Sequence, residues 1–200
     1  KVKIGDTITL AAAPSKEMLP GYKEACPMVF SGLYPLDTSD YPKLKKSVGK
    51  LRLNDAAFTY QSETSAALGF GFRCGFLGLL HMEIVQERLD REFGVDLITT
   101  VPNVEYHVRF TDGSEEIIES PTALPDLGRI ESVSEPVVRV RIVAPAEYIG
   151  NIQKLAHERR AVFRGMSYLD RERVELDYEL PLAEIVLDFY DRIKSSTRGF

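Results

Sequence analysis

The chain lacks the features that define several common classes of protein. It has only two cysteines in 200 residues, Cys26 and Cys74, too few for a disulfide framework and without metal-ligand spacing. No apolar run approaches the ~20 residues of a membrane-spanning helix. Its 25 lysines and arginines face 30 acidic residues, and a net charge of -5 argues against coating nucleic acid by bulk electrostatics. We expect a cytoplasmic protein whose cysteines are small core residues.

Nucleotide-binding motifs are also missing. There is no G-x-x-x-x-G-K-[ST] sequence, and no G-x-G-x-x-G sequence joins a strand to a helix. We therefore predict no catalytic residue, cofactor site or metal site in these 200 residues. The first residues, from Lys1 to Asp6, lack an initiator methionine and are not a signal peptide. They are typical of a strand entered partway, so we expect a piece of a longer protein.

The most informative stretch runs from residue 69 to residue 94. Its first part alternates apolar residues with glycine or arginine, which predicts a strand with Phe70, Phe72, Cys74 and Phe76 on one face. Gly71, Arg73 and Gly75 fall on the other face, where the bare backbone would allow another backbone or a partner to approach closely. Helical spacing from Leu79 to Phe93 follows, and Gly94 marks the helix end.

The pattern around this stretch predicts an α+β fold. We expect strands near 28–34, 57–61, 69–76 and 96–100 and helices at 41–53 and 79–93, which is the split βαβ or ferredoxin-like order. Residues 134–200 repeat this order without a last strand, with helices beginning at Pro145 and Pro181. The expected domains are therefore 27–103 and 134–200, separated by a hairpin and linker at 104–133. Residues 1–26 would be the end of a β-barrel domain and a linker.

Cys74 and His81 are candidates for a nucleophile and its base. The predicted elements place one of them within a strand and the other on the next helix, and no third orienting group is evident. A small-molecule enzyme is thus one alternative, and it would need a pocket that converges on both side chains. The bland interpretation is a buried cysteine and a histidine that makes a local hydrogen bond.

Gly69-Phe70-Gly71-Phe72 partly matches the RRM octapeptide, whose aromatic residues stack on RNA bases. Leu68, Arg73 and Gly75 depart from that motif. A stand-alone RRM-like RNA-binding module is therefore the second alternative. It requires Phe70 and Phe72 to be exposed, whereas an aromatic stripe of this kind is more often core.

Basic residues are the remaining signal for a binding surface. Lysines cluster on the first predicted helix, at Lys43, Lys45, Lys46 and Lys50, and arginines cluster near a later helix end, at Arg159, Arg160 and Arg164. Such groups could pair with backbone phosphates, although a solvated charged face is an equally common interpretation.

The run from Gly69 to Ile84 resembles the G-F-G-F-R-x-G-F-L-G-L-L-H-M-E-I sequence of the LepA family (elongation factor four). The resemblance covers nearly the whole chain, through segments at 20–24, 28–35, 50–56, 135–136, 145–150 and 194–199. The last two are also similar to the C-terminal domain of elongation factor G. Arg160-Ala161 stands where the family often has Arg-Gly, which puts a tight turn there in doubt.

The resemblance implies a ribosome-dependent GTPase that acts on elongating ribosomes, with back-translocation of tRNA as the proposed activity. It implies that this chain is a non-catalytic middle portion, with domains like domain III and the C-terminal domain V of elongation factor G. GTP and magnesium would belong to a GTPase domain outside the chain, and tRNA would be approached only through a missing C-terminal domain.

The implied partners are ribosomal RNA and proteins near the factor-binding site. We expect a cytoplasmic monomer, with peripheral membrane association possible for the whole protein. The candidate ribosome, RNA or interdomain contacts are nine cations: Arg73, Lys45, Lys46, Lys50, Arg159, Arg160, Arg164, Lys194 and Arg198.

Overall fold

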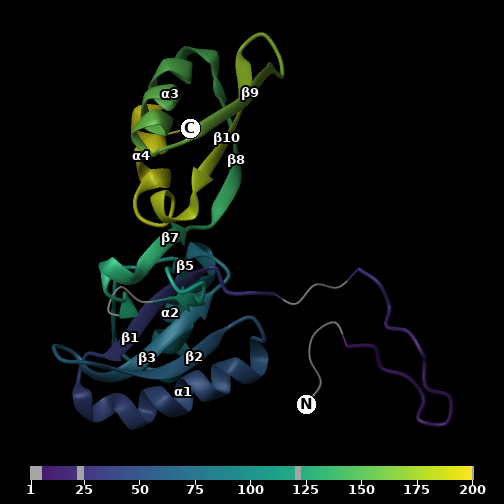
Figure 1. The fold of residues 1–200 in the computed structure, drawn as a ribbon, viewed down its shortest axis with the longest axis vertical. Helices are drawn as coiled ribbons and strands as arrows, with labels where there is room; N and C mark the ends of the chain where they lie inside the picture. Colours follow the sequence, from purple (N-terminus) through teal and green to yellow (C-terminus); the bar gives the residue numbers. More distant parts are fainter. Residues whose placement is uncertain (1–5, 22–24, 120–122, 200) are drawn as a thin grey trace. The chain divides into compact units, whose positions relative to one another are not determined.

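The computed structural model describes residues 6–21, 25–119 and 123–199 (Figure 1). The chain divides into two compact units, Lys1–Thr100 and Val101–Phe200, and each is described by itself. No helix in the described ranges is long and apolar enough to cross a membrane.

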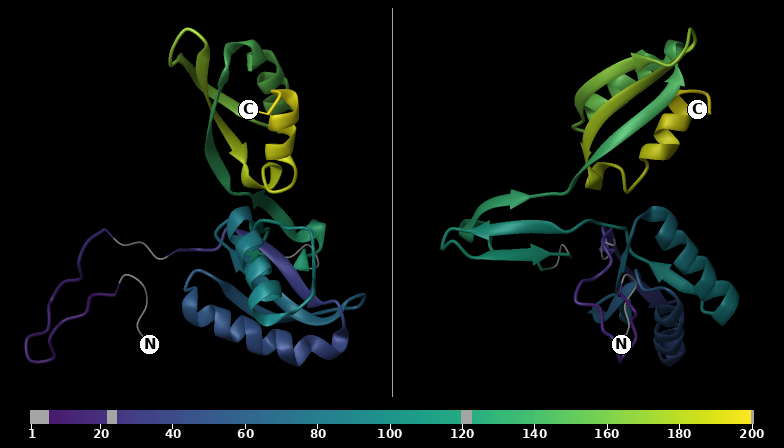
Figure 2. Two further views of the ribbon diagram at one scale, coloured as in Figure 1. Left: turned by 180° about the vertical axis from the view of Figure 1, so that it is seen from behind. Right: turned by 90° about the vertical axis from the view of Figure 1, so that its right-hand side faces the viewer.

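The first unit contains the predicted ferredoxin-like order. Its elements are β1 (Val29–Pro35), the short 3-10 helix η1 (Thr38–Asp40), α1 (Tyr41–Asn54), β2 (Thr59–Ser65), β3 (Gly69–Phe76), α2 (Leu79–Phe93) and β4 (Leu97–Thr99). The strands form one sheet in the order β2-β3-β1-β4, and every neighbouring pair is antiparallel. Both helices pack on one face of this sheet (Figure 2).

Helical periodicity predicts the core of this unit correctly. Leu44, Val48 and Leu51 of α1 are fully buried, together with Val85 and Leu89 of α2. Pro42 lies in the first turn of α1, where its missing N–H costs no helical hydrogen bond. Gly94 ends α2 in the left-handed conformation, with φ of 60°. The sequence signals at these helix ends therefore act as expected.

Residues 104–134 form a separate three-stranded sheet. Its strands β5 (Tyr106–Phe110), β6 (Glu115–Ile118) and β7 (Ile130–Ser134) are ordered β6-β5-β7. The hairpin between β5 and β6 turns at Asp112-Gly113, as predicted, with Gly113 at φ of 82°. Strand β7, and the 3-10 turn η3 (Leu127–Arg129) before it, are missed by the sequence analysis. Four of the five β7 residues are exposed, so backbone pairing with β5 forms this strand without an apolar pattern.

Residues 134–199 contain the second ferredoxin-like arrangement. Its elements are β8 (Val137–Pro145), η4 (Ala146–Tyr148), α3 (Ile149–Glu158), β9 (Val162–Tyr168), β10 (Arg173–Pro181), η5 (Leu182–Glu184) and α4 (Phe189–Ser196). The strand order is β8-β10-β9. The α-helices do not begin at Pro145 and Pro181 as predicted. Each proline instead ends a strand and caps a 3-10 turn, because its ψ of 143° or 132° is extended.

The expected β-barrel end lies partly outside the described residues. Residues 6–21 contain one isolated bridge, between Leu10 and Ala13, where an alternating strand was expected. Ile8 and Leu10 are 86% and 76% exposed, so their side chains have no packed face to join in the described part of the chain. Assignment of this segment to a β-barrel stays a prediction.

Candidate nucleic-acid interface

The α1 lysines lie on the solvent side of their helix, opposite its buried stripe. Lys45, Lys46 and Lys50 are all exposed. Lys50 places its ammonium 5.8 Å from the centre of the Phe93 ring, a cation–π contact with α2. Lys45 and Lys46 make no ion pair with any residue that the structure describes. Their charges are therefore available to an anionic partner.

The arginines at the end of α3 are occupied by carboxylates of their own unit. Arg159 pairs with Asp188 and, at 3.5 Å, with Glu184. Arg160 lies 2.8 Å from Glu184 and 2.5 Å from Glu135. Arg160 also has φ of 55°, so it makes the tight turn for which the family often uses glycine. These two predicted contact residues connect α3 to η5 and to the segment before β8.

Arg164 belongs to a charged ladder on the helix-free face of the second ferredoxin-like sheet. It pairs with Glu179 at 2.5 Å. Arg139 and Arg141, which the sequence analysis did not select, bind Asp177 at 2.8 and 3.3 Å. The hydrogen bond from Arg139 is the main cause that lowers the pKa of the Asp177 carboxyl. The alternation of 137–145 places these arginines on one face, but their partners on β10 are visible only in the structure.

Lys194 and Arg198 lie at the end of α4. Both are exposed, and neither forms an ion pair with a described residue. Arg198 is left-handed, with φ of 53°, and the preceding turn is closed by hydrogen bonds from the Thr197 and Gly199 amides to the Lys194 carbonyl. These two cations resemble the α1 lysines in being open to a partner.

Arg73 is different because its side chain is only 8% exposed. It lies on the face of β3 opposite the helices, between Gly71 and Gly75. The predicted close approach at this face is made by β1 of the same domain. A Cβ added to Gly71 would meet the Tyr34 ring and lie 2.6 Å from the Leu33 carbonyl oxygen. A Cβ added to Gly75 would lie 3.0 Å from the Phe30 ring.

Gly71 lets the Tyr34 side chain lie across β3. The Tyr34 hydroxyl donates a 2.7 Å hydrogen bond to Glu63 on β2, the strand on the far side of β3. Burial and this contact with Glu63 raise the pKa of Tyr34 to about 12, against an opposing effect of the Arg73 charge. The glycines therefore serve a buried polar row, and Arg73 takes part in its electrostatics.

The aromatic residues of β3 do not form an RRM-like platform. Phe72 is buried in the core below the helices, and its ring stacks on Tyr41 of α1 at 5.4 Å. Phe70 is 63% exposed, but its ring lies 5.7 Å from the same Tyr41. Both rings are thus on the helix-covered face of the sheet, whereas stacking on RNA bases needs an open face.

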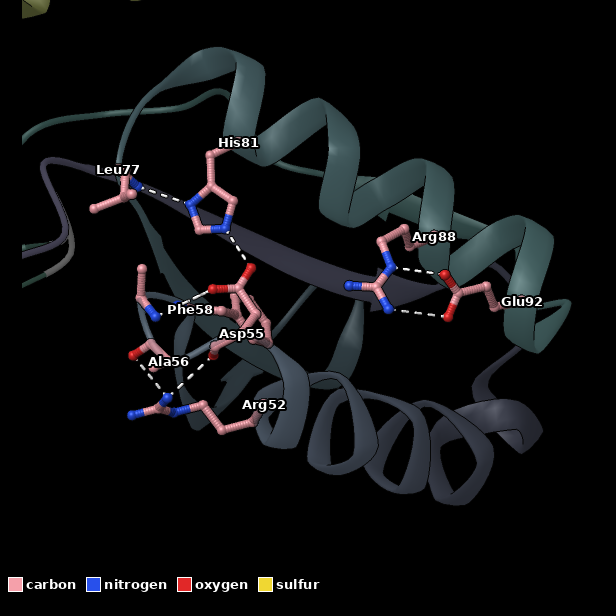
Figure 3. A network of polar contacts seen from close by, with 9 residues as sticks. Arg52, Asp55, Ala56, Phe58, Leu77, His81, Arg88 and Glu92 are labelled. Atoms are coloured by element: carbon pink, nitrogen blue, oxygen red, sulfur yellow. Dashed lines mark hydrogen bonds and ion pairs between the residues drawn. The ribbon is translucent and has the colours of Figure 1, made fainter. Parts of the chain in front are cut away.

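Cys74 and His81 do not form a nucleophile–base pair. Cys74 is fully buried, and burial raises the pKa of its thiol, which disfavours the reactive thiolate. His81 has both ring nitrogens engaged, as Figure 3 shows: Nδ1 accepts the Leu77 N–H at 3.0 Å, and Nε2 lies 2.7 Å from Asp55 Oδ2. The local hydrogen-bonding interpretation of His81 is confirmed.

Asp55 is the centre of this cluster and was not selected by the sequence analysis. It follows α1, and its Oδ1 accepts the N–H groups of Ala57 and Phe58, both at 3.1 Å. Burial opposes ionisation of Asp55, but the His81 contact and these amides outweigh it and lower the pKa of the carboxyl. Arg52 donates to the Asp55 and Ala56 carbonyls (Figure 3). The cluster therefore joins the end of α1 to the first turn of α2.

The described residues show no group of three or more histidine, cysteine, aspartate or glutamate side chains placed to hold a metal ion. Residues of the Gly69–Phe76 strand are internal to the sheet, so they form no phosphate-binding turn. Neither Mg²⁺ nor a nucleotide therefore fits a site in this part of the chain.

Comparisons with known proteins agree with this picture. Residues 132–200 match the family model described as elongation factor G C-terminus. The chain is 59% identical over 198 residues to elongation factor 4 of Chlorobium phaeobacteroides (strain BS1) and 56% identical over 199 residues to that of Symbiobacterium thermophilum. These alignments cover 99% and 100% of this chain and 33% of each relative, so the chain spans about a third of their length.

A solved structure shows the same fold at low sequence identity. A crystal structure of a protein from Thermus thermophilus covers 93% of this chain and 41% of its own, with a TM-score of 0.51 and 18% identity. It supports the α+β architecture alone. The identity to several elongation factor 4 sequences extends over nearly all of the chain, through both ferredoxin-like arrangements. The chain therefore belongs to the elongation factor 4 family, of whose relatives it spans about a third.

Proposed function

We propose that this chain is a non-catalytic, ribosome-binding portion of a translational GTPase. It would act on elongating ribosomes in the cytoplasm, in a protein for which back-translocation of tRNA is the proposed activity. Residues 27–103 and 134–200 would correspond to domain III and the C-terminal domain of elongation factor G. They would couple a GTPase domain to ribosomal RNA as a monomer, with any tRNA or peripheral membrane contact made by other parts of the protein.

The α1 lysines carry this proposal. Lys45 and Lys46 are exposed neighbours that have no carboxylate partner among the described residues. A lysine without an internal partner can neutralise a phosphate and release its counterion, whereas an arginine already held by a carboxylate contributes less. We therefore rank Lys45 and Lys46 first as RNA contacts, followed by Lys50, Lys194 and Arg198.

The paired cations have a different proposed role. Arg159, Arg160 and Arg164 hold elements of their own unit together, so they would set the shape of the binding surface rather than bind RNA themselves. Arg73 is too covered for direct contact with RNA, which favours a role in positioning one part of the protein against another. GTP and Mg²⁺, which the family relationship implies, would be bound by a part of the relatives that this chain does not span.

Co-sedimentation with ribosomes tests the proposal. The chain and its Lys45→Glu/Lys46→Glu variant are pelleted with ribosomes at salt concentrations from about 50 to about 200 mM, with elongation factor G as competitor. We expect displacement by the competitor and, for the variant, roughly tenfold weaker binding with a salt slope shallower by about two. A matched Lys154→Glu/Arg171→Glu control makes the same charge change at exposed sites on α3 and the β9–β10 turn. Equal losses in both variants, or none, would contradict a contact through α1.

A further inference from the structure

The first unit has an open groove between α2 and the edge strand β4. Its volume is about 450 Å³. Strand β4 is the outermost strand of its sheet, so this side of the groove has no neighbouring strand among the described residues. The lining combines apolar side chains with carboxylates: Leu36, Val95, Leu97, Glu87, Asp90 and Asp96.

The exposed side of α2 extends the apolar part of this surface. Leu80 and Ile84 are 70% and 46% exposed, although α2 has its own buried stripe at Val85 and Leu89. Ile84 precedes the groove residue Glu87 by three positions and Leu80 precedes it by seven, so helical spacing puts all three on one side of α2. Leu36, in the groove, is also 66% exposed. Several large apolar side chains thus lack a packing partner at one place.

The charge of this surface is distinctive. Glu87 is paired with Arg91 at 2.7 Å, but Glu83, Asp90 and Asp96 have no cation within ion-pair distance in the described part of the chain. The carboxylates of the β10 ladder, by contrast, are held by arginines. A surface with surplus carboxylates repels phosphate and attracts lysine and arginine.

We propose that this groove, lined by Leu36, Leu97, Asp90 and Asp96, docks a basic polypeptide segment. Lysine or arginine side chains of the partner pair with Asp90 and Asp96, and an apolar side chain between them packs on Leu36 and Leu97. The apolar contacts require a polypeptide, and the charge excludes nucleic acid. This interaction goes beyond the RNA contact proposed for α1, because it uses the other helix of the domain and the opposite charge.

Fluorescence anisotropy tests this docking with the whole chain. The probe is a fluorescein-labelled peptide of four lysine and arginine residues around a central leucine, and a second peptide carries serine in place of the leucine. The Asp90→Asn/Asp96→Asn variant removes two charges from exposed positions in the groove. The control, Glu131→Gln/Glu147→Gln, removes two charges from the second unit, at positions outside the groove.

We expect the groove variant to bind the leucine peptide at least about fivefold more weakly than the unaltered chain, and the control to differ by less than about twofold. The serine peptide should bind the unaltered chain several-fold more weakly, since it lacks the apolar contact. Equal weakening in both variants, equal binding of the two peptides, or no binding of either would overturn the proposal. None of these results depends on the ribosome experiment with the α1 lysines.

Discussion

Substitution of Gly71 by alanine should destabilise the first unit severely. The added Cβ would lie 2.6 Å from the Leu33 carbonyl oxygen and 2.7 Å from Cε1 of the Tyr34 ring, well inside the 3.4–4 Å of ordinary contact. The Leu33 oxygen belongs to the paired backbone of β1 and cannot withdraw. The Tyr34 ring must therefore move, although it is buried and its hydroxyl is fixed by Glu63.

The cost has two parts. Overpacking of a buried site costs about 1–3 kcal/mol. Loss of the hydrogen bond from the buried Tyr34 hydroxyl to the Glu63 carboxylate adds about 1–3 kcal/mol. We expect Gly71→Ala to lower the free energy of unfolding by about 2–5 kcal/mol.

Urea unfolding followed by far-ultraviolet circular dichroism measures this change, since the chain has no tryptophan for fluorescence. Hydrogen exchange of β1 and β3 peptides localises the loss to the first unit. The control is Gly78→Ala, where nothing lies within 4 Å of an added Cβ, and we expect a change below about 0.5 kcal/mol. In a Tyr34→Leu background the cost of Gly71→Ala should fall, because the two effects share one contact. A Gly71→Ala variant as stable as the control would refute the reasoning.

Three further predictions concern the polar contacts. Asp55→Asn should cost about 1–3 kcal/mol at neutral pH by weakening the contacts to His81 and the backbone amides. Because the pKa of Asp55 is lowered in the folded state, its stabilisation is present above the unfolded pKa of about 4 and is lost as pH falls through the folded value. The gap between the parent chain and Asp55→Asn in thermal melts should therefore narrow in acid, and a gap that widens would contradict the sign. Arg160→Gly should relieve the left-handed backbone and raise stability by about 0.5–1 kcal/mol in high salt, where its surface ion pairs are screened, whereas Arg160→Val should lower it. Tyr178→Phe should leave urea stability unchanged or raise it, because the buried Tyr178 hydroxyl has no hydrogen-bond partner in the described residues, and a loss above about 1 kcal/mol would show a missed contact.

The sequence predicts the elements of the first unit well because their patterns are strong. The alternation of 69–76 and the helical spacing of 79–93 are long, and proline and glycine mark the helix ends. Phe70 shows the limit of this reasoning. Alternation places it on the correct face, but it cannot show that this end of β3 extends past the packed core, where the side chain is exposed.

The candidate binding residues are less predictable from sequence. Arg160 meets Glu135 and Glu184 from segments about 25 positions away, and Arg164 meets Glu179 across a strand pair. Nothing in the spacing of the arginines reveals these partners, because they depend on the tertiary fold. The same holds for Arg73, whose face is bare in the sequence and covered in the structure by side chains from β1. Lys45 and Lys46 keep their predicted exposure because both lie opposite the apolar stripe of α1.

The Tyr34 side chain also has a consequence for how the strands can move. It starts on β1, lies across β3 at Gly71 and ends at Glu63 on β2, so one residue spans three strands. A slip of β3 by one position would bring the side chain of Phe72 or the backbone of Phe70 to the place of Gly71 and turn every side chain of the strand to the opposite face. The bare glycine under this ring thus acts as a register key that resists shear of the central strands.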